Sequence, residues 1–277
     1  MKLGFHISIA GGLGQVVARA RAFRCATFQI FTRNPRSWKY KGLDLKEAAV
    51  FRTACRASRI APVFIHMPYV INLASPRKVL FNRSVRSLIC DLGRSLAIGA
   101  QFVIAHTGSG STIHQGIEAM TRGINQALKA TKQTVVLLEN TPGEGREIGF
   151  RFEHLAAIIN GIDDKKRIGV VLDTAHAFQA GYDLRSEDAV KRTFDEFDDV
   201  IGLERLHLVH FNDSLTEYGS CKDRHWHVGQ GAIGSGMRYI IIHAALKNVP
   251  FIMETPRQSD ADDRRNMETA RNYLGKT

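Results

Sequence analysis

Eight short apolar segments recur along the chain at nearly even intervals, and no other feature limits its fold as strongly. Each segment is a few residues long and almost continuous in hydrophobicity, which is typical of parallel strands covered on both faces. The segments are Leu3–Ile7, Ala26–Phe31, Pro62–Ile65, Phe102–Ala105, Val135–Leu138, Gly169–Leu172, Leu206–Val209 and Pro250–Met253. The repeat averages about 35 residues, which is the size of a βα unit.

Stretches with helical periodicity lie between these segments. Examples are Leu45–Ser58, Arg77–Ile98, Gly116–Thr131 and Glu187–Phe197. No linker rich in Pro, Gly or Ser divides the 277 residues. The alternation therefore predicts an α/β protein with a single domain over residues 1–277, folded as a closed (β/α)8 TIM barrel with its active site at the C-terminal ends of the strands. An open doubly wound sheet gives a similar pattern and is the alternative.

Composition and charge narrow the class of protein. With 44% hydrophobic and 23% charged residues, the chain is neither disordered nor a collagen-like repeat nor a coiled coil. The 38 Lys and Arg residues exceed the 27 Asp and Glu residues, which gives a net charge of +11. A protein this basic usually binds a polyanion, although a basic surface can also serve solubility alone.

The chain has no sequence signal for export or for a membrane. Its N-terminal apolar stretch is interrupted by His6 and Ser8, and no apolar run approaches the roughly 20 residues that span a bilayer. The four cysteines are too far apart for a disulfide framework or a thiolate metal site: Cys25, Cys55, Cys90 and Cys221. We therefore expect a soluble, cytoplasmic protein with no membrane partner.

Imidazole or carboxylate groups follow the last six apolar segments, at the places where barrel enzymes build their active sites. These residues are His66, His106, Glu139, Asp173 with His176, His210 and Glu254. A single histidine after a strand is more often structural, but such residues at six successive strand ends predict one polar mouth. Several imidazoles and carboxylates without a thiolate are a ligand set for zinc or manganese.

The number of candidate ligands indicates more than one metal ion. A mononuclear catalytic zinc uses about three protein ligands, and a carboxylate such as Glu139 can bridge two ions. The segment from Asp223 to His227 adds further donors. In an extended segment Asp223 and His225 point to the same side, as do His225 and His227, so spacing alone does not choose between the two pairs.

The segment Phe31-Thr-Arg-Asn-Pro-Arg-Ser-Trp38 follows the second predicted strand and is unusually rich in groups that bind nucleic acid. Arginines such as Arg33 and Arg36 can grip phosphates, and an indole can pack on a sugar or base. Tyr69 adds a phenol to the next loop. Alternatively, Asn34-Pro35 is only a turn and Trp38 only covers the barrel rim. Together with the net charge, the segment favours nucleic acid as the partner.

In this order the motifs resemble those of endonuclease IV, a family of apurinic/apyrimidinic endonucleases with three zinc ions. The resemblance covers nearly the whole chain. Its motifs are Gly4-Phe-His6-Ile-Ser8 with Gly11-Gly12, Phe31 to Trp38, His66-Met-Pro-Tyr69-Val-Ile-Asn72, Glu139-Asn-Thr-Pro-Gly143, Asp173-Thr-Ala-His176 with Gly181-Tyr-Asp183, His210-Phe-Asn-Asp213-Ser, Lys222-Asp-Arg-His225 with Gly229-Gln-Gly231, and Glu254-Thr-Pro256.

The resemblance implies how the ligands divide among three zinc ions, with manganese a candidate at one site. One ion takes His66, His106 and Glu139. A second shares Glu139 and adds Asp173, His210 and Glu254. The third takes His176, Asp223 and His225, which leaves out His227.

The resemblance also implies the activity, which is hydrolysis of the phosphodiester 5′ to an abasic site in duplex DNA. The products are a 3′-hydroxyl and a 5′-deoxyribose phosphate. Glu139 and Glu254 are the implied catalytic residues. Arg36 and Tyr69 match loop residues that enter the DNA at the lesion, and Asn34, Trp38 and Arg224 join them as DNA contacts. A monomer is expected.

Three residues depart from the family pattern, and two other functions remain open. Thr107, Pro142 and Ala175 stand where proline, a small residue and cysteine are common, but none is a predicted ligand. A sugar isomerase or epimerase would place one or two divalent ions at similar strand ends. A catalytically inactive nucleic-acid-binding barrel would be expected to have lost ligands. About three zinc ions per chain would favour the nuclease.

Overall fold

The computed structural model describes residues 1–39 and 41–275. Eight strands form one closed barrel, so the predicted TIM barrel is confirmed and the open sheet is excluded. They are β1 (Leu3–His6), β2 (Thr27–Ile30), β3 (Val63–His66), β4 (Phe102–His106), β5 (Val135–Glu139), β6 (Ile168–Asp173), β7 (Leu206–His210) and β10 (Phe251–Met253). Every neighbouring pair is parallel, and β10 closes the barrel between β7 and β1.

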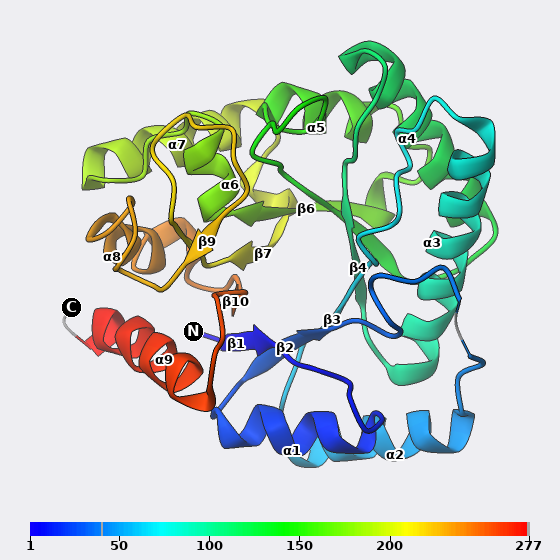
Figure 1. Ribbon diagram of the computed structural model, residues 1–277, viewed down its shortest axis with the longest axis horizontal. Helices are drawn as coiled ribbons and strands as arrows, with labels where there is room; N and C mark the ends of the chain where they lie inside the picture. Colours follow the sequence, from blue (N-terminus) through cyan, green and yellow to red (C-terminus); the bar gives the residue numbers. More distant parts are fainter. Residues whose placement is uncertain (40, 276–277) are drawn as a thin grey trace.

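Helices lie on the outside of the barrel, as Figure 1 shows. The α-helices are α1 (Gly14–Ala22), α2 (Leu45–Ala57), α3 (Lys78–Ile98), α4 (Ile113–Lys129), α5 (Phe152–Asn160), α6 (Thr174–Gln179), α7 (Glu187–Val200), α8 (Gly236–Ile241) and α9 (Asp260–Gly275). Single 3-10 turns span Lys165–Arg167, Leu203–Arg205 and Ala244–Leu246. None of the described helices is long and apolar enough to cross a membrane. The four cysteines are free.

Local capping groups determine where several helices begin and end. The Thr112 hydroxyl accepts the Gln115 N–H at 3.2 Å, so α4 begins earlier than its periodicity predicts. Ser186 caps α7 in the same way through the Ala189 N–H. Helix α3 ends at Gly99, whose φ of 76° is the left-handed conformation that favours glycine.

The barrel interior contains an apolar layer below a polar layer. Six strands each contribute one fully buried side chain to the apolar layer: Phe64, Ile104, Leu137, Val171, Leu208 and Ile252. Two positions further along come His66, His106, Glu139, Asp173, His210 and Glu254. Because side chains alternate along a strand, each of these polar residues points inward above its apolar neighbour. The period of a strand therefore places the predicted ligands at the mouth.

A small two-stranded sheet covers part of the mouth. Strand β8 (Asp213–Ser214) pairs with β9 (His225–Trp226) in antiparallel fashion, with Ser214 opposite His225. The Asp213 carboxylate accepts the Ser214 and Gly231 N–H groups at 2.8 and 2.9 Å. A Cβ at Gly231 would lie 2.6 Å from that carboxylate, so this close approach requires glycine. The sheet holds the segment with Asp223 and His225 over the barrel.

Candidate metal centre

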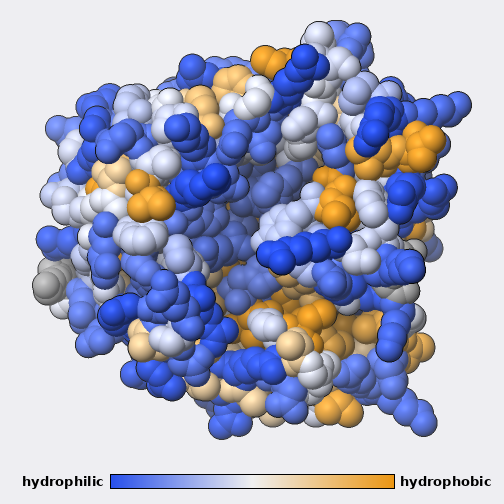
Figure 2. Space-filling view, in the orientation of Figure 1, coloured by the Kyte–Doolittle hydropathy of each residue, from blue (hydrophilic) through white to orange (hydrophobic). Residues whose placement is uncertain are grey.

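A cavity of about 880 Å³ opens at the C-terminal ends of the strands. Figure 2 shows it as a hydrophilic hollow near the middle of the face. The predicted site residues that line it are Arg36, His66, Tyr69, His106, Glu139, His176, Asp223, Arg224, His225 and Glu254. The structure thus gathers residues from distant parts of the sequence into one cavity.

The Glu139 carboxylate lies at the centre of the cluster and is only 1% exposed. Its Oε2 atom lies 3.1 Å from His66 Nε2 and 3.3 Å from His106 Nε2. Its Oε1 atom faces the other way and lies 2.8 Å from His210 Nδ1. The two oxygens thus face two different groups of donors, as a bridging carboxylate requires.

The second group of donors lies deeper in the barrel and is rich in carboxylates. It combines Glu139, Asp173, His210 and Glu254, whose donor atoms lie within 4.8 Å of one another. His210 Nδ1 is 3.2 Å from Glu254 Oε2 and 3.7 Å from Asp173 Oδ2. These are the four residues that the resemblance assigns to a second ion.

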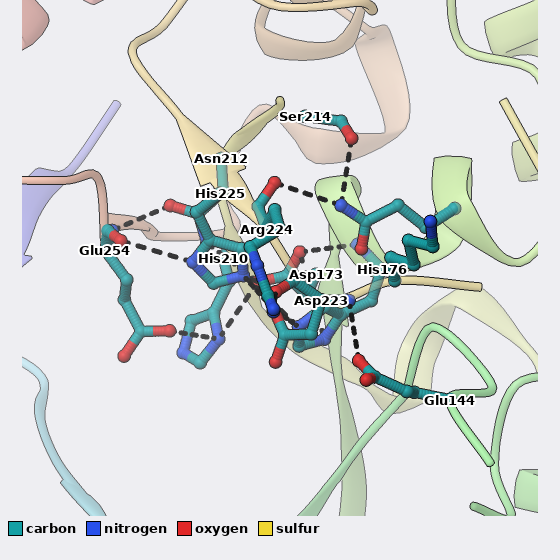
Figure 3. A network of polar contacts seen from close by, with 12 residues as sticks. Glu144, Asp173, His176, His210, Asn212, Ser214, Asp223, Arg224, His225 and Glu254 are labelled. Carbon is teal, nitrogen blue, oxygen red and sulfur yellow. Dashed lines mark hydrogen bonds and ion pairs between the residues drawn. The ribbon is translucent and has the colours of Figure 1, made fainter. Parts of the chain in front are cut away.

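The third group lies next to the small sheet, whose strand β9 contributes His225 (Figure 3). Nε2 of His176 is 3.2 Å from Nε2 of His225. Asp223 Oδ1 lies 3.3 Å from His176 and 3.6 Å from His225. Asp173 also approaches His225, at 3.4 Å. The nine predicted ligands therefore fall into three adjoining groups, with Asp223 the most exposed of the third set.

His227, the alternative partner for His225, lies outside these groups. Its Nδ1 atom is 3.2 Å from the side-chain amide of Asn266 on α9. The structure therefore brings together the pair of Asp223 and His225, which spacing alone left undecided.

The hydrogen bonds of the imidazoles fit the binding of metal ions. His66, His176 and His225 each donate Nδ1–H to a main-chain oxygen, at 2.7, 2.9 and 3.2 Å. In a neutral ring Nε2 then has a lone pair and no proton. This lone pair faces the lone pair of another imidazole or a carboxylate oxygen. Such an arrangement requires a cation, or extra protons, between the donors. Metal-binding histidines are oriented in this way in proteins generally.

The electrostatics of the metal-free cluster favour positive charge. Burial alone would lower the pKa of His210, but the carboxylates of Glu254 and Glu139 outweigh it and raise the pKa to about 9. Burial would raise the pKa of Asp223, but the hydrogen bond and charge of His176 hold it at about 2. The buried anionic centre thus attracts cations in general.

We predict that zinc affinity of the metal-free protein rises with pH. Below about pH 9 the His210 imidazole carries a proton that a metal ion must displace. For each proton displaced, zinc affinity therefore falls by up to about tenfold for each unit by which the pH is lowered. Calorimetric titration with zinc at pH 6, 7 and 8, in buffers of different ionisation enthalpy, measures both affinity and released protons. An affinity that is constant over this range would contradict the prediction.

Two buried asparagines, neither of them predicted from the sequence to have a role, orient the ligands. Asn212 donates to Asp173 Oδ2 at 2.7 Å, and its carbonyl oxygen accepts the Glu254 N–H at 2.7 Å. Asn140 accepts the Asp173 N–H at 2.6 Å. Each asparagine lies one or two positions after a predicted ligand in the sequence, and this proximity is the only sequence feature that could have indicated its role.

The residues predicted to contact DNA occupy different environments. Arg36, Arg224 and Tyr69 line the cavity, and Tyr69 is 61% exposed with its ring edge against Phe31. Asn34 accepts the Arg36 N–H at 2.9 Å, as the turn interpretation expects.

Two further residues of the same loop pack against α3. The guanidinium of Arg83 lies 4.3 Å from the ring of Trp38, so packing at the barrel rim accounts for the indole, and its contact with DNA stays a prediction. The suggestion that Arg33 grips phosphate is wrong, because Arg33 is buried and pairs with Asp91 at 2.7 Å. This ion pair instead anchors the loop that carries Arg36.

Comparisons with known proteins agree with this geometry. A family model described as a xylose isomerase-like TIM barrel matches residues 17–276. The chain is 42% identical to a probable endonuclease 4 of Methanosphaerula palustris, over 98% of this chain and 97% of that protein. It superimposes on the crystal structure of endonuclease IV from Thermus thermophilus with a TM-score of 0.91 and 37% identity, over the whole of both chains.

One further structural likeness extends to the fold alone. A D-tagatose 3-epimerase-like protein superimposes with a TM-score of 0.76 but is only 17% identical. The two endonuclease relatives described above, by contrast, are similar in sequence along nearly the full length. The chain therefore belongs to the xylose isomerase-like TIM barrels and, among them, to the endonuclease IV family.

Proposed function

We propose that this protein is a zinc-dependent DNA repair endonuclease that hydrolyses the phosphodiester 5′ to an abasic site in duplex DNA. Water adds across the bond between phosphorus and the 3′ oxygen, which leaves a 3′-hydroxyl and a 5′-deoxyribose phosphate. The observation that carries the proposal is the position of Glu139, whose two carboxylate oxygens face two groups of buried donors. Membership of the endonuclease IV family supports the substrate.

The donor groups fit three zinc ions. Zinc binds imidazole and carboxylate groups, and His66, His106, His176, His210 and His225 supply the imidazoles. The group of Glu139, Asp173, His210 and Glu254 contains three carboxylates, so it is where we expect manganese to replace zinc most readily. When bound, such ions lower the pKa of water from about 15.7 toward 7 and neutralise charge on phosphoryl oxygens.

Glu254 is the residue that we propose positions or deprotonates the attacking water. Its Oε1 atom is fixed by contacts with Gln29 and His6, at 2.6 and 3.1 Å, while Oε2 faces the cluster. Charge from His210 and the hydrogen bond from His6 outweigh burial and hold the pKa of Glu254 below its usual value. The carboxylate therefore stays ionised and available as an acceptor near neutral pH.

Side chains at the rim are suited to hold the DNA backbone. Tyr69 lines the cavity, and its phenol keeps its proton near neutral pH, so it can donate a hydrogen bond to a phosphate. Arg36 and Arg224 add positive charge at the same cavity. An abasic nucleotide has no base to unstack, which makes it cheaper to extrude into such a cavity than a normal nucleotide.

Elemental analysis of the purified protein tests the metal stoichiometry. We expect about three zinc ions per chain, because three donor groups adjoin one another: the first two share Glu139, and Asp173 of the second also lies beside His176 and His225. One or two ions would instead favour the sugar isomerase or epimerase. A protein without bound metal would favour the inactive nucleic-acid-binding barrel.

We predict that Arg36→Ala weakens binding to abasic duplex by about tenfold or more while leaving the metal content unchanged. If Arg36 enters the duplex at the lesion, binding to undamaged duplex falls less. If it only pairs with a phosphate, both duplexes bind more weakly. The slope of log affinity against log salt concentration then becomes shallower by about one. Affinity for both duplexes is measured across a salt series.

Arg205→Ala is the matched control, because Arg205 directly precedes β7 at the opposite end of the barrel and donates to the Lys165 carbonyl oxygen. Equal affinities of wild type and Arg36→Ala for both duplexes would remove this loop from the DNA site. Action in the cytoplasm and as a monomer remains a prediction from the sequence.

A further inference from the structure

Strand β2 supplies no predicted ligand, but its side chain Gln29 belongs to the polar layer of the barrel. Gln29 pairs in register with His6 on β1, and it follows Thr27 by two positions on the same inward face. It is completely buried. A long polar side chain at such a position requires hydrogen-bond partners, and here these partners are residues of the metal centre.

Two contacts of the Gln29 amide fix its orientation. Its Nε2 atom lies 2.6 Å from Glu254 Oε1, the oxygen to which His6 Nδ1–H also donates. Its Oε1 atom lies 2.8 Å from His210 Nε2. The reversed amide would place its carbonyl oxygen against the Glu254 carboxylate, where both atoms accept and neither donates. The amide therefore donates to Glu254 and accepts from His210.

This orientation determines which nitrogen of His210 is free. Because Gln29 Oε1 only accepts, His210 Nε2 must carry the proton that it donates. In the neutral ring Nδ1 is then unprotonated, and it faces Glu139 and Glu254 at 2.8 and 3.2 Å. His210 thus offers Nδ1 to the cluster, whereas His66, His176 and His225 offer Nε2.

We propose that Gln29 is a positioning residue of the metal centre, which selects Nδ1 of His210 as a ligand and turns Oε2 of Glu254 toward the same ion. The inference rests on the proposed function, since it requires an ion in the group of Glu139, Asp173, His210 and Glu254. One uncharged amide thereby aligns two ligands from strands β7 and β10. The loss of such partners typically lowers metal affinity about 10- to 100-fold.

The test compares wild type with Gln29→Met and with Thr27→Val as a matched control. Methionine has nearly the length of glutamine but neither donates nor accepts at these distances. Thr27 is equally buried on the same face of β2, and its hydroxyl donates to the Pro62 carbonyl oxygen at 2.7 Å, away from the cluster. Thr27→Val therefore removes a buried hydrogen bond from the strand without touching a ligand.

Two measurements are made on zinc-loaded protein. Elemental analysis after dialysis against a graded series of zinc chelator gives the number of ions retained. Long-range ¹H–¹⁵N correlation spectra report the tautomer of His210 and the hydrogen bond of its Nε2–H. For Gln29→Met we expect one ion to be lost at about 10- to 100-fold lower chelator strength, with the Nε2–H signal shifted upfield. Thr27→Val should match wild type.

Wild-type ion retention together with an unchanged His210 spectrum in Gln29→Met would overturn the inference. So would an equal loss of one ion in Thr27→Val, since packing of β2 would then be the cause. If Gln29→Met does not fold, Gln29→Glu replaces it, because it still accepts from His210 but repels Glu254. Full ion retention in Gln29→Glu would also overturn the inference. Wild-type protein that binds no zinc would overturn the proposed function itself.

Discussion

Replacement of Glu139 by alanine is expected to lower the rate of DNA cleavage by at least about 10³-fold. The two oxygens of Glu139 face two donor groups, so the substitution removes a ligand from both at once. Metal ions supply several kcal/mol of transition-state stabilisation, and each 1.36 kcal/mol is a factor of about ten in rate. Cleavage of an abasic duplex and the zinc content of the same preparation are measured together, and both are expected to fall.

Glu118→Ala is a control of the same chemical type, because Glu118 forms a histidine–carboxylate contact with His114 on the exposed face of α4. It should retain both activity and metal. Circular dichroism should show that Glu139→Ala is folded, since the apolar layer of the barrel lies below the mouth. A Glu139→Ala variant with near-normal activity and full metal content would show that this carboxylate does not bridge.

Prolonged treatment with a strong chelator is expected to inactivate the enzyme completely but slowly. The donors are deeply buried: the side chains of His66, Glu139, Asp173 and His210 are at most 2% exposed. Zinc should restore cleavage, with partial recovery in manganese. Magnesium alone should not, because magnesium prefers oxygen ligands and retains its waters, whereas five of the nine proposed ligands are imidazoles.

Activity and bound zinc are followed over the same time course, with protein kept without chelator as the control. The loss of activity should track the loss of zinc. An enzyme that resists the chelator and is switched on by magnesium would require a different chemistry of phosphodiester cleavage.

The fold was predictable because its signal is repeated eight times. Each apolar segment is covered by helices on its outer face and by the packed barrel interior on its inner face, so its hydrophobicity is continuous. One misread segment would not have changed the architecture. The small sheet of β8 and β9 was not predicted. Each of its strands has only two residues, too few to show a periodic pattern. The Asp213 carboxylate holds this segment by accepting the main-chain N–H groups of Gly231 and Ile233, which the sequence pattern does not reveal.

Six of the nine proposed ligands were recognisable because each ends or directly follows an apolar strand, where a histidine or carboxylate stands out. Gln29 lies within the apolar segment Ala26–Phe31, and its amide has no charge to draw attention. Only the register of β1 with β2 shows that it shares the inward face with the ligands. The roles of Asn140 and Asn212 likewise depend on contacts between neighbouring strands.

Side-chain packing explains why the loop after β2 was only partly understood. The sequence shows two arginines and an indole together, but not that Asp91 and Arg83 on α3 lie opposite them. Asp91 pairs with Arg33, and Arg83 covers Trp38. Of the two arginines, only Arg36 lines the cavity. The residue types predict a loop suited to binding nucleic acid. Packing against α3 determines which of its side chains are free to contact DNA.

The most direct test of the account is the cleavage of a duplex that carries a single tetrahydrofuran residue, an abasic analogue without the aldehyde that elimination requires. Zinc-loaded protein is predicted to cut this strand once, immediately 5′ to the analogue. The upstream fragment should end in a 3′-hydroxyl that a DNA polymerase extends. An intact duplex in the presence of fully zinc-loaded protein, or a cut on the 3′ side of the analogue, would contradict the account.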